Sequence, residues 1–157
     1  MSAVIDSNVF LRLVFEEPGW EECGRLLDAV YAGTQQAVIS AIQFSELYTP
    51  FERANDGATR RKLANEITKS RIKVRSVDRK VAELSARLRV TEKTPRGSWL
   101  ALADSIILAT ALIEKAETLY TLDVDFSNVT AHIKIAAPGM SIQEWDRLYG
   151  HRIRKQG

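Results

Sequence analysis

Four acidic residues in distant parts of the chain have the right chemistry to act together: Asp6, Glu46, Asp104 and Asp123. If they meet in the folded protein, their like charges raise one another's pKa values and oppose folding. A hard divalent cation removes this repulsion, because oxygen-only sites select Mg²⁺ or Mn²⁺ over softer metals. Such an ion lowers the pKa of a bound water and neutralises charge on a phosphate during its hydrolysis. The four carboxylates therefore predict a metal site for phosphate chemistry.

Taken singly, each of these carboxylates also has an ordinary structural explanation. Asp6 follows a short apolar run, where an acidic residue often starts a turn or caps a helix. Glu46 and Asp104 are harder to explain as surface charges, because Glu46 has apolar neighbours and Asp104 lies inside the apolar stretch 99–109. A helix N-cap is the structural alternative for Asp104. The set of four carboxylates is therefore stronger evidence for a metal site than any one of them.

The histidines and the cysteine do not predict a zinc site. His132 and His151 are isolated in the sequence, with no partner at zinc-ligand spacing. Cys23 has no second cysteine with which to form an intrachain disulfide, and this fits a reducing compartment. Apolar residues at helical intervals around Cys23 indicate that it is buried and not reactive.

Short β-branched runs alternate with longer helical patterns, and this order predicts the fold. Strands are expected over residues 3–5, 37–39, 72–77, 118–122 and 133–136. Helices are expected over residues 20–31, 40–51, around 63–67, over 81–88 and 102–115, and after 141. Asp78 and the capping boxes Ser40–Gln43 and Ser141–Glu144 mark three of the helix starts. The pattern predicts a single-domain α/β/α sandwich with a mostly parallel, five-stranded sheet.

In such a sheet the carboxyl ends of the strands share one edge, and ligands bind beyond that edge. Asp6 follows the first predicted strand and Asp123 follows the fourth. Glu46 lies in the helix that leaves the second strand at the same edge. Asp104 lies near the start of a rather apolar helix, which we expect to be packed on more than one side and to run back toward the amino ends of the strands. All four carboxylates are therefore expected to converge on the carboxyl edge.

Length and composition indicate one soluble domain. A chain of 157 residues, 45% of them hydrophobic, has the size of a domain with a single core. The formal net charge of +2 does not by itself imply nucleic-acid binding, although a catalyst needs only a local basic rim. The apolar start is interrupted by Asp6 and has no basic run before it, unlike a signal peptide or a membrane span. We expect a cytoplasmic protein with a main domain over residues 1–140 and a short helix and basic tail over 141–157.

Four segments, in order between Ala3 and about Ala137, resemble the motifs of the PIN-domain family. They are residues 4–11 (VIDSNVFL), 39–47 (ISAIQFSEL), 103–111 (ADSIILATA) and 119–126 (LYTLDVDF). The resemblance implies a parallel α/β/α sandwich and an Mg²⁺- or Mn²⁺-dependent endoribonuclease that leaves 5′-phosphate and 3′-hydroxyl ends. The chain length is similar to that of the toxins of VapBC toxin–antitoxin pairs. This implies a homodimer that is silenced by a small antitoxin protein, with RNA as the substrate.

The same resemblance implies roles for individual residues. The catalytic set becomes Asp6, Glu46, Asp104 and Asp123. Of these, the three aspartates are the implied metal ligands, and Glu46 ligates the metal or orients the attacking water. Supporting or phosphate-contacting roles fall on three neighbours: Ser7, Asn8 and Thr121.

The pair Asp123 and Asp125 leaves two alternatives open. Their i, i+2 spacing places both on one side if the strand continues, whereas a turn would separate them. The register of the motif favours Asp123, with Asp125 as a helper or a turn former.

Some residues outside the acidic set are candidates for contacts with RNA. Lys93, Arg96 and Arg12 have the charge to hold phosphates near the site, although a solvated surface charge is the commoner role. Trp99 has the ring to stack on a base, but a place in the core or in a dimer interface is the stronger expectation.

Other classes of protein fit the sequence less well. A haloacid-dehalogenase-like phosphatase needs a second Asp two residues after the first, and here that position is Asn8. A receiver domain needs an adjacent acidic pair beside the first strand, where Asp6 stands alone. The complete acidic quartet argues against a non-catalytic RNA- or protein-binding relative. A nuclease of the same fold in RNA processing or quality control stays open as an alternative.

Overall fold

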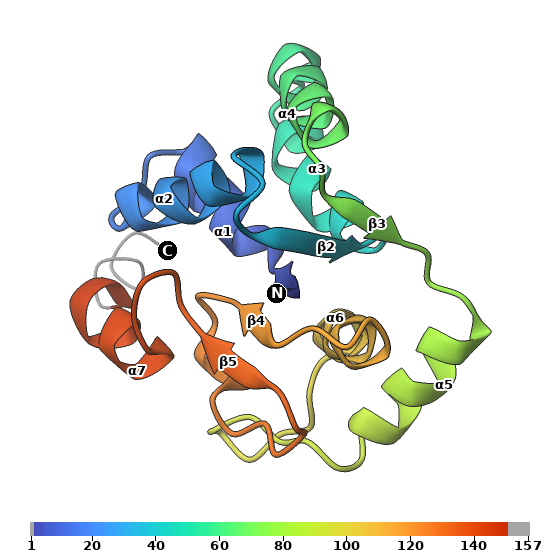
Figure 1. The fold of residues 1–157 in the computed structure, drawn as a ribbon. Coiled ribbons are helices and arrows are strands. Elements are labelled where there is room, and N and C mark those ends of the chain that lie inside the picture. Colours follow the sequence, from blue (N-terminus) through green and yellow to red (C-terminus); the bar gives the residue numbers. More distant parts are fainter. Residues whose placement is uncertain (1, 151–157) are drawn as a thin grey trace.

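Five parallel strands form the sheet on which the predicted site residues depend (Figure 1). The computed structural model describes residues 2–150. The strands are β1 (Ser2–Ile5), β2 (Gln36–Ser40), β3 (Lys73–Arg75), β4 (Thr118–Tyr120) and β5 (Lys134–Ala136). Their order is β3-β2-β1-β4-β5, and every neighbouring pair is parallel. The predicted α/β fold with a five-stranded sheet is therefore confirmed, with β3 and β4 shorter than the sequence pattern indicated.

Helices alternate with the strands as predicted. They are α1 (Ser7–Val14), α2 (Trp20–Tyr31), α3 (Gln43–Arg53), α4 (Gly57–Lys69), α5 (Arg79–Leu88), α6 (Leu102–Ile113) and α7 (Ile142–Trp145). A 3₁₀ turn covers Val124–Phe126 and a π-helical turn covers Asp146–Gly150. Within residues 2–150, the structure has no helix that is both long and apolar enough to cross a membrane. The predicted basic tail, including His151, lies outside the described residues.

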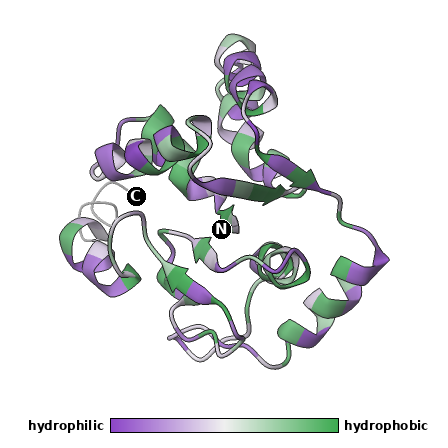
Figure 2. Ribbon diagram, viewed as in Figure 1, coloured by the Kyte–Doolittle hydropathy of each residue, from purple (hydrophilic) through white to green (hydrophobic). Residues whose placement is uncertain are grey.

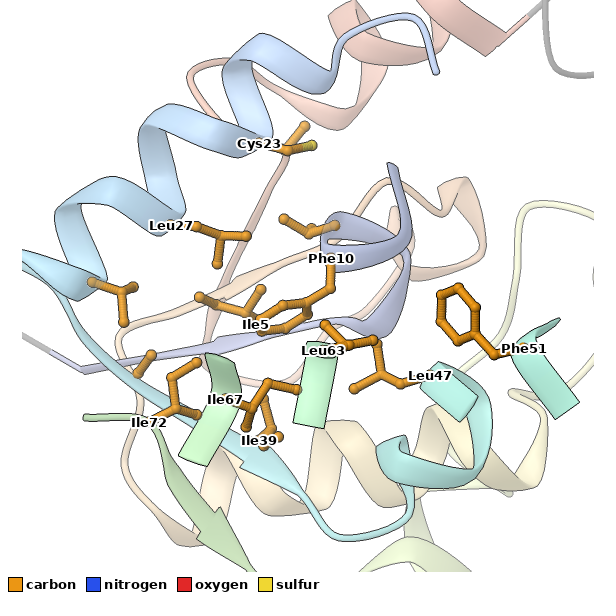
Figure 3. Packing of buried hydrophobic residues seen from close by; sticks show 14 of the residues in the cluster. Ile5, Phe10, Cys23, Leu27, Ile39, Leu47, Phe51, Leu63, Ile67 and Ile72 are labelled. Atoms are coloured by element: carbon orange, nitrogen blue, oxygen red, sulfur yellow. The ribbon is translucent and has the colours of Figure 1, made fainter. Parts of the chain in front are cut away.

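One face of the sheet packs against the helices α1 to α4 (Figure 3). Ile5 and Ile39 project from β1 and β2 toward this layer, where Phe10, Leu47 and Leu63 meet them. All five side chains are buried. This apolar cluster fixes α1 and α3 against the sheet, and these two helices begin at the edge where Asp6 and Glu46 lie.

The other face packs against α5 and α6. The neighbouring residues Val4 and Val38 point to this side, together with Leu119 of β4. Residues 105–111 of α6 are buried without a break, and Figure 2 shows this helix as mainly hydrophobic. The expectation that α6 is packed on more than one side is confirmed, since α6 lies between the sheet and α5. A helix held this firmly gives Asp104, in its first turn, a fixed position.

Helix α1 is an element that the sequence pattern did not predict. Asp6 begins this helix as its N-cap, and its carboxylate accepts a hydrogen bond from the backbone N–H of Ser7. The β-branched and aromatic residues Val9 and Phe10 have modest helix propensity. Both are fully buried, so tertiary packing stabilises the helix where propensity does not.

Two of the three predicted helix starts are confirmed. Asp78 accepts a hydrogen bond of 3.0 Å from the backbone of the first turn of α5, and Ser141 does the same at 3.1 Å for α7. The prediction that Ser40 is an N-cap is wrong, because the chain first makes a turn and α3 begins at Gln43. Gln43 nevertheless reaches back to the N–H of Ser40 at 2.9 Å. Glu46 therefore lies in the first turn of α3.

Candidate active site

Asp6 lies where β1 passes into α1. Its backbone N–H donates to the carbonyl of Tyr120 at 2.9 Å, which extends the pairing with β4 by one residue. The carboxylate is buried and accepts two hydrogen bonds of 2.7 Å, from the N–H of Ser7 and from the hydroxyl of Thr121. Burial raises the pKa of Asp6 to about 7, although the Thr121 hydrogen bond acts in the opposite direction. Asp6 is thus a rigid and poorly hydrated carboxylate.

Glu46 is held by a buried polar network that starts at Gln43. The Gln43 amide donates to the carbonyl of Ile5 at 2.7 Å and to the hydroxyl of Ser7 at 3.3 Å, so it ties α3 to the end of β1. One helical turn further, the Glu46 carboxylate accepts a hydrogen bond of 2.9 Å from the Ser7 hydroxyl. Gln43 is therefore a positioning residue, whereas its sequence pattern indicated only a capping box.

Asp104 enters the site from the first turn of α6. The N-cap of this helix is Ala101, so the interpretation of Asp104 as an N-cap is wrong. Within the described residues, no donor forms a hydrogen bond with the Asp104 carboxylate. Burial raises the pKa of Asp104 to about 7, and the charges of four other carboxylates add to this effect: Asp6, Asp123, Glu46 and Asp125. All the predicted acidic residues and Asp125 therefore lie close enough to influence one site.

Asp123 and Asp125 lie in the turn that follows β4. The backbone N–H of Asp123 donates to the Thr121 hydroxyl at 3.1 Å, and the Asp123 carboxylate accepts from the N–H of Asp125 at 2.9 Å. Burial raises the pKa of Asp123, while the hydrogen bond from Asp125 lowers it. Asn8 steadies the same turn by accepting from the N–H of Leu122 at 3.2 Å.

Three carboxylates form the tightest cluster: Asp104, Asp123 and Asp125 contribute oxygens that all lie within 4.8 Å of one another. Oxygens that share one divalent ion at ~2.1–2.5 Å have separations of this size. Of the two alternatives left open for Asp123 and Asp125, the chain makes a turn after β4, and this 3₁₀ turn keeps both carboxylates in the same cluster. This cluster contains Asp125 and not Asp6, whose role as a direct ligand stays a prediction. The donor set is all oxygen, which fits Mg²⁺ or Mn²⁺.

Two expectations about the surrounding residues need correction. Arg12 is buried, donates to the carbonyl of Pro18 at 3.1 Å and lies over the Trp145 ring. It is therefore not the solvated surface charge that the sequence suggested, and it links α1 to Trp145 of α7. Trp99 is 49% exposed, so the expectation of a core position is wrong. Cys23 is buried as predicted, and burial raises the pKa of its thiol to about 12.

These features define a class: α/β proteins that gather carboxylates at the carboxyl edge of a parallel sheet. The family model of the PIN domain matches residues 3–131 of this chain. The chain therefore belongs to the PIN domain family, which confirms the resemblance found in the sequence. PIN domains are nucleases, so the enzyme class is hydrolase. A comparison with curated protein sequences finds no significant match.

Solved structures with the same fold come from toxin–antitoxin systems. A chain of a toxin–antitoxin complex from Klebsiella pneumoniae is 25% identical, with a TM-score of 0.64 over 88% of this chain and 98% of that one. A chain of VapBC-1 from nontypeable Haemophilus influenzae is 20% identical, with a TM-score of 0.65 over 87% and 98%. Mycobacterium tuberculosis VapC20, a toxin that cleaves the sarcin-ricin loop, is 14% identical, with a TM-score of 0.66 over 84% and 98%. The fold is thus that of VapC toxins.

Proposed function

We propose that this protein is a metal-dependent endoribonuclease and the toxin of a type II toxin–antitoxin pair. The observation that supports the chemistry most directly is the cluster of Asp104, Asp123 and Asp125, whose oxygens lie within 4.8 Å of one another. Neutral groups would pack there at lower cost, because burial and mutual repulsion raise the pKa values of Asp104 and Asp123. A bound divalent cation would explain why three carboxylates occupy this position.

The three clustered aspartates would hold Mg²⁺ or Mn²⁺, with Asp6 as a further ligand, directly or through water. When bound, the ion would supply charge neutralisation for the scissile phosphate and a lower pKa for a nearby water. Thr121 keeps Asp6 in orientation, and its hydroxyl also accepts from the Asp123 backbone. One hydroxyl therefore fixes the relative positions of two acidic residues from different segments.

Glu46 is the residue that we assign to the attacking water. Its carboxylate oxygen Oε1 accepts from Ser7, which leaves Oε2 to orient the water and take its proton. The water oxygen forms a bond to phosphorus as the bond from phosphorus to the 3′-oxygen breaks, and the leaving oxygen acquires a proton from solvent. The products are a 5′-phosphate and a 3′-hydroxyl.

Purified protein and defined RNA oligonucleotides test this proposal. We expect cleavage with Mg²⁺ or Mn²⁺, none with a chelator, and 5′-phosphate ends in the products. Asp6→Asn and Asp104→Asn should each lower the rate at least a hundredfold while the circular dichroism spectrum is retained. Asp28→Asn, at an exposed position on α2, is the matched control and should cut at the wild-type rate. Wild-type rates in both site variants would refute the assignment.

A small antitoxin protein is the proposed partner. The structure has an open groove of about 470 Å³ between α1, α2 and α4, with apolar walls that include Leu13, Val14 and Tyr31 and polar rims at Lys62 and Glu66. Such a groove suits an amphipathic segment of a partner. The similar complexes from Klebsiella pneumoniae and Haemophilus influenzae contain toxin and antitoxin together.

The neighbouring reading frame offers a direct test of the partner. Expression of the chain alone should arrest growth, and co-expression of a small neighbouring protein should restore it. Tyr31→Glu should weaken the purified complex at least tenfold, whereas Val90→Glu, at another exposed apolar position, should not. Cleavage of RNA without growth arrest would favour a role in RNA processing instead.

A homodimer and a cytoplasmic location complete the proposal. Both follow from the resemblance to VapC toxins, and the single buried thiol of Cys23 fits a reducing compartment. Sedimentation of the purified protein at several concentrations tests the dimer, and fractionation of cells tests the location.

A further inference from the structure

The connection between α5 and α6 contains a short hairpin, residues 93–99, which we call the 93–99 hairpin. Lys93 and Trp99 form an antiparallel bridge at its base. Inside it, the N–H of Thr94 donates to the carbonyl of Ser98 at 2.8 Å, and the two hydroxyls are also 2.8 Å apart. Gly97 closes the turn with a φ of 83°, a conformation that favours glycine. Residues 93–99 are thus held in an ordered hairpin by their own hydrogen bonds.

Buried residues on both sides anchor the hairpin. Glu92, which precedes it, is 3% exposed, and its carboxylate accepts hydrogen bonds from the N–H and the hydroxyl of Thr130 at 2.9 and 3.0 Å. Leu100, which follows it, is buried and donates its N–H to the Glu92 carbonyl at 3.1 Å. The hairpin therefore projects from a fixed base.

The hairpin lies beside the acidic cluster. Nη2 of Arg96 lies 2.9 Å from Oδ2 of Asp125, and Trp99 precedes the helix whose first turn holds Asp104. The Arg96 side chain is 73% exposed. A guanidinium has five N–H donors, so Arg96 can bind a further anion while it stays at Asp125.

The exposed surface of the hairpin combines an aromatic ring with cations. Nζ of Lys93 lies 4.6 Å from the centre of the Trp99 ring, and nearly half of Trp99 remains exposed. Aromatic platforms flanked by basic side chains bind single-stranded nucleic acids, because unpaired bases stack and phosphates pair with the cations. In a duplex the bases are already stacked, so the ring has no partner there.

We propose that the 93–99 hairpin is the RNA-binding arm of the site and selects single-stranded segments. Trp99 stacks on an unpaired base near the scissile phosphate, and Lys93 and Arg96 bind the neighbouring phosphates. The positive charge beside an acidic, phosphate-cleaving site favours RNA over a second protein as the occupant of this surface. This inference rests on the proposed nuclease function for its substrate, but its binding test does not require cleavage.

Binding is measured in the Asp104→Asn background with Mg²⁺, so that the RNA is not consumed. The probe is a short fluorescein-labelled RNA oligonucleotide of mixed sequence, used single-stranded and annealed to its complement. Trp99→Ala should weaken binding of the single strand about tenfold, which is the order expected for one lost stack. Trp99→Phe should restore most of it. Phe15→Ala, at another aromatic residue that is about half exposed, should bind like the parent.

The cations are tested through the dependence of affinity on salt. Lys93→Gln and Arg96→Gln should each reduce the slope of log affinity against log salt by about 0.7, the value for one phosphate contact on a single strand. Arg79→Gln is the matched control, because Arg79 is also exposed and paired with a carboxylate, Glu83 of α5.

The outcomes separate this inference from the proposed function. Equal affinity of Trp99→Ala and its parent for the single strand would overturn the inference, as would equal affinity of the parent for single strand and duplex. A smaller sedimenting mass for Trp99→Ala would assign Trp99 to a dimer interface and would also overturn it. If the protein binds single-stranded RNA selectively but the wild type cleaves no RNA, the binding role of the 93–99 hairpin is supported and the proposed nuclease function is refuted.

Discussion

Replacing Asp104 by asparagine should stabilise the metal-free protein at alkaline pH. Burial and the neighbouring carboxylates raise the pKa of Asp104 from 3.8 to about 7. Between about pH 4 and pH 7 this carboxyl is therefore protonated in the folded state and ionised in the unfolded state. Stability decreases as pH rises through this range, because the unfolded state then binds fewer protons than the folded state. An asparagine side chain at this position has no charge to desolvate, so its contribution does not depend on pH.

The size of the effect follows from the same difference in pKa. The interval from 3.8 to about 7 corresponds to an upper limit of about 4 kcal/mol at pH 8. Asp104 is partly exposed and can relax toward solvent, so we reduce this to about 1–2 kcal/mol. Because no described residue donates a hydrogen bond to its carboxylate, the substitution breaks no such contact. Asp6 would be a poorer choice, since an amide there would disturb its bonds to Ser7 and Thr121.

Urea unfolding with a chelator measures this difference. At pH 8, Asp104→Asn should unfold at a higher urea concentration than the wild type, and at pH 4 the two midpoints should nearly coincide. Mg²⁺ should then stabilise the wild type at pH 8 and have little effect on the variant. Two results would refute the conclusion that the buried charge of Asp104 destabilises the folded state. One is a variant less stable than the wild type at pH 8, and the other is a difference in stability that does not change with pH.

Three further predictions concern the residues that support the site. Thr121→Val removes a hydrogen bond that lowers the pKa of Asp6, so the acidic limb of the pH–rate profile should move to higher pH; an unchanged limb would exclude Asp6 from the titration. Gln43→Leu leaves buried backbone groups without partners and should cost about 2–4 kcal/mol in urea unfolding; a cost near zero would contradict the network. At Gly97, where an added Cβ meets no atom within 4 Å, Gly97→Ala should strain only the backbone, cost about 1 kcal/mol in thermal unfolding and weaken binding of single-stranded RNA; parent-like stability and affinity would show that the turn tolerates the change.

The sequence predicted the sheet well because its strands are short runs of β-branched residues between clear helix signals. It also predicted where the carboxylates meet, since the carboxyl ends of parallel strands share one edge. The prediction that Asp6 and Glu46 lie at the same edge of the sheet depends on this rule alone. Helix α1 escaped prediction because residues 7–14 contain β-branched and aromatic side chains, and these become helical only by packing on the core.

The polar connections within the site were less predictable, because they join residues far apart in the chain. Nothing in the sequence indicates that Gln43 bonds to Ile5 or that Arg96 pairs with Asp125. Arg12 was misjudged for the same reason. A basic residue in the sequence suggests a surface charge, and only the fold shows that Trp145 of α7 packs against it. Local sequence patterns predict helices and strands, whereas the contacts between these elements become known only from the folded structure.

The five carboxylates differ in their hydrogen-bond and ion-pair partners, and this difference supports the division of tasks that we propose for them. Asp6 accepts two hydrogen bonds, Glu46 accepts one from Ser7, Asp123 accepts one from the N–H of Asp125, and Asp125 forms an ion pair with Arg96. Asp104 has no such partner within the described residues, and its pKa is raised to about 7. A cation therefore gains most by binding at Asp104, because it relieves the least compensated charge. Arg96, a residue of the 93–99 hairpin, already pairs with Asp125. The group proposed to bind substrate would therefore also stabilise one of the proposed ligands of the ion.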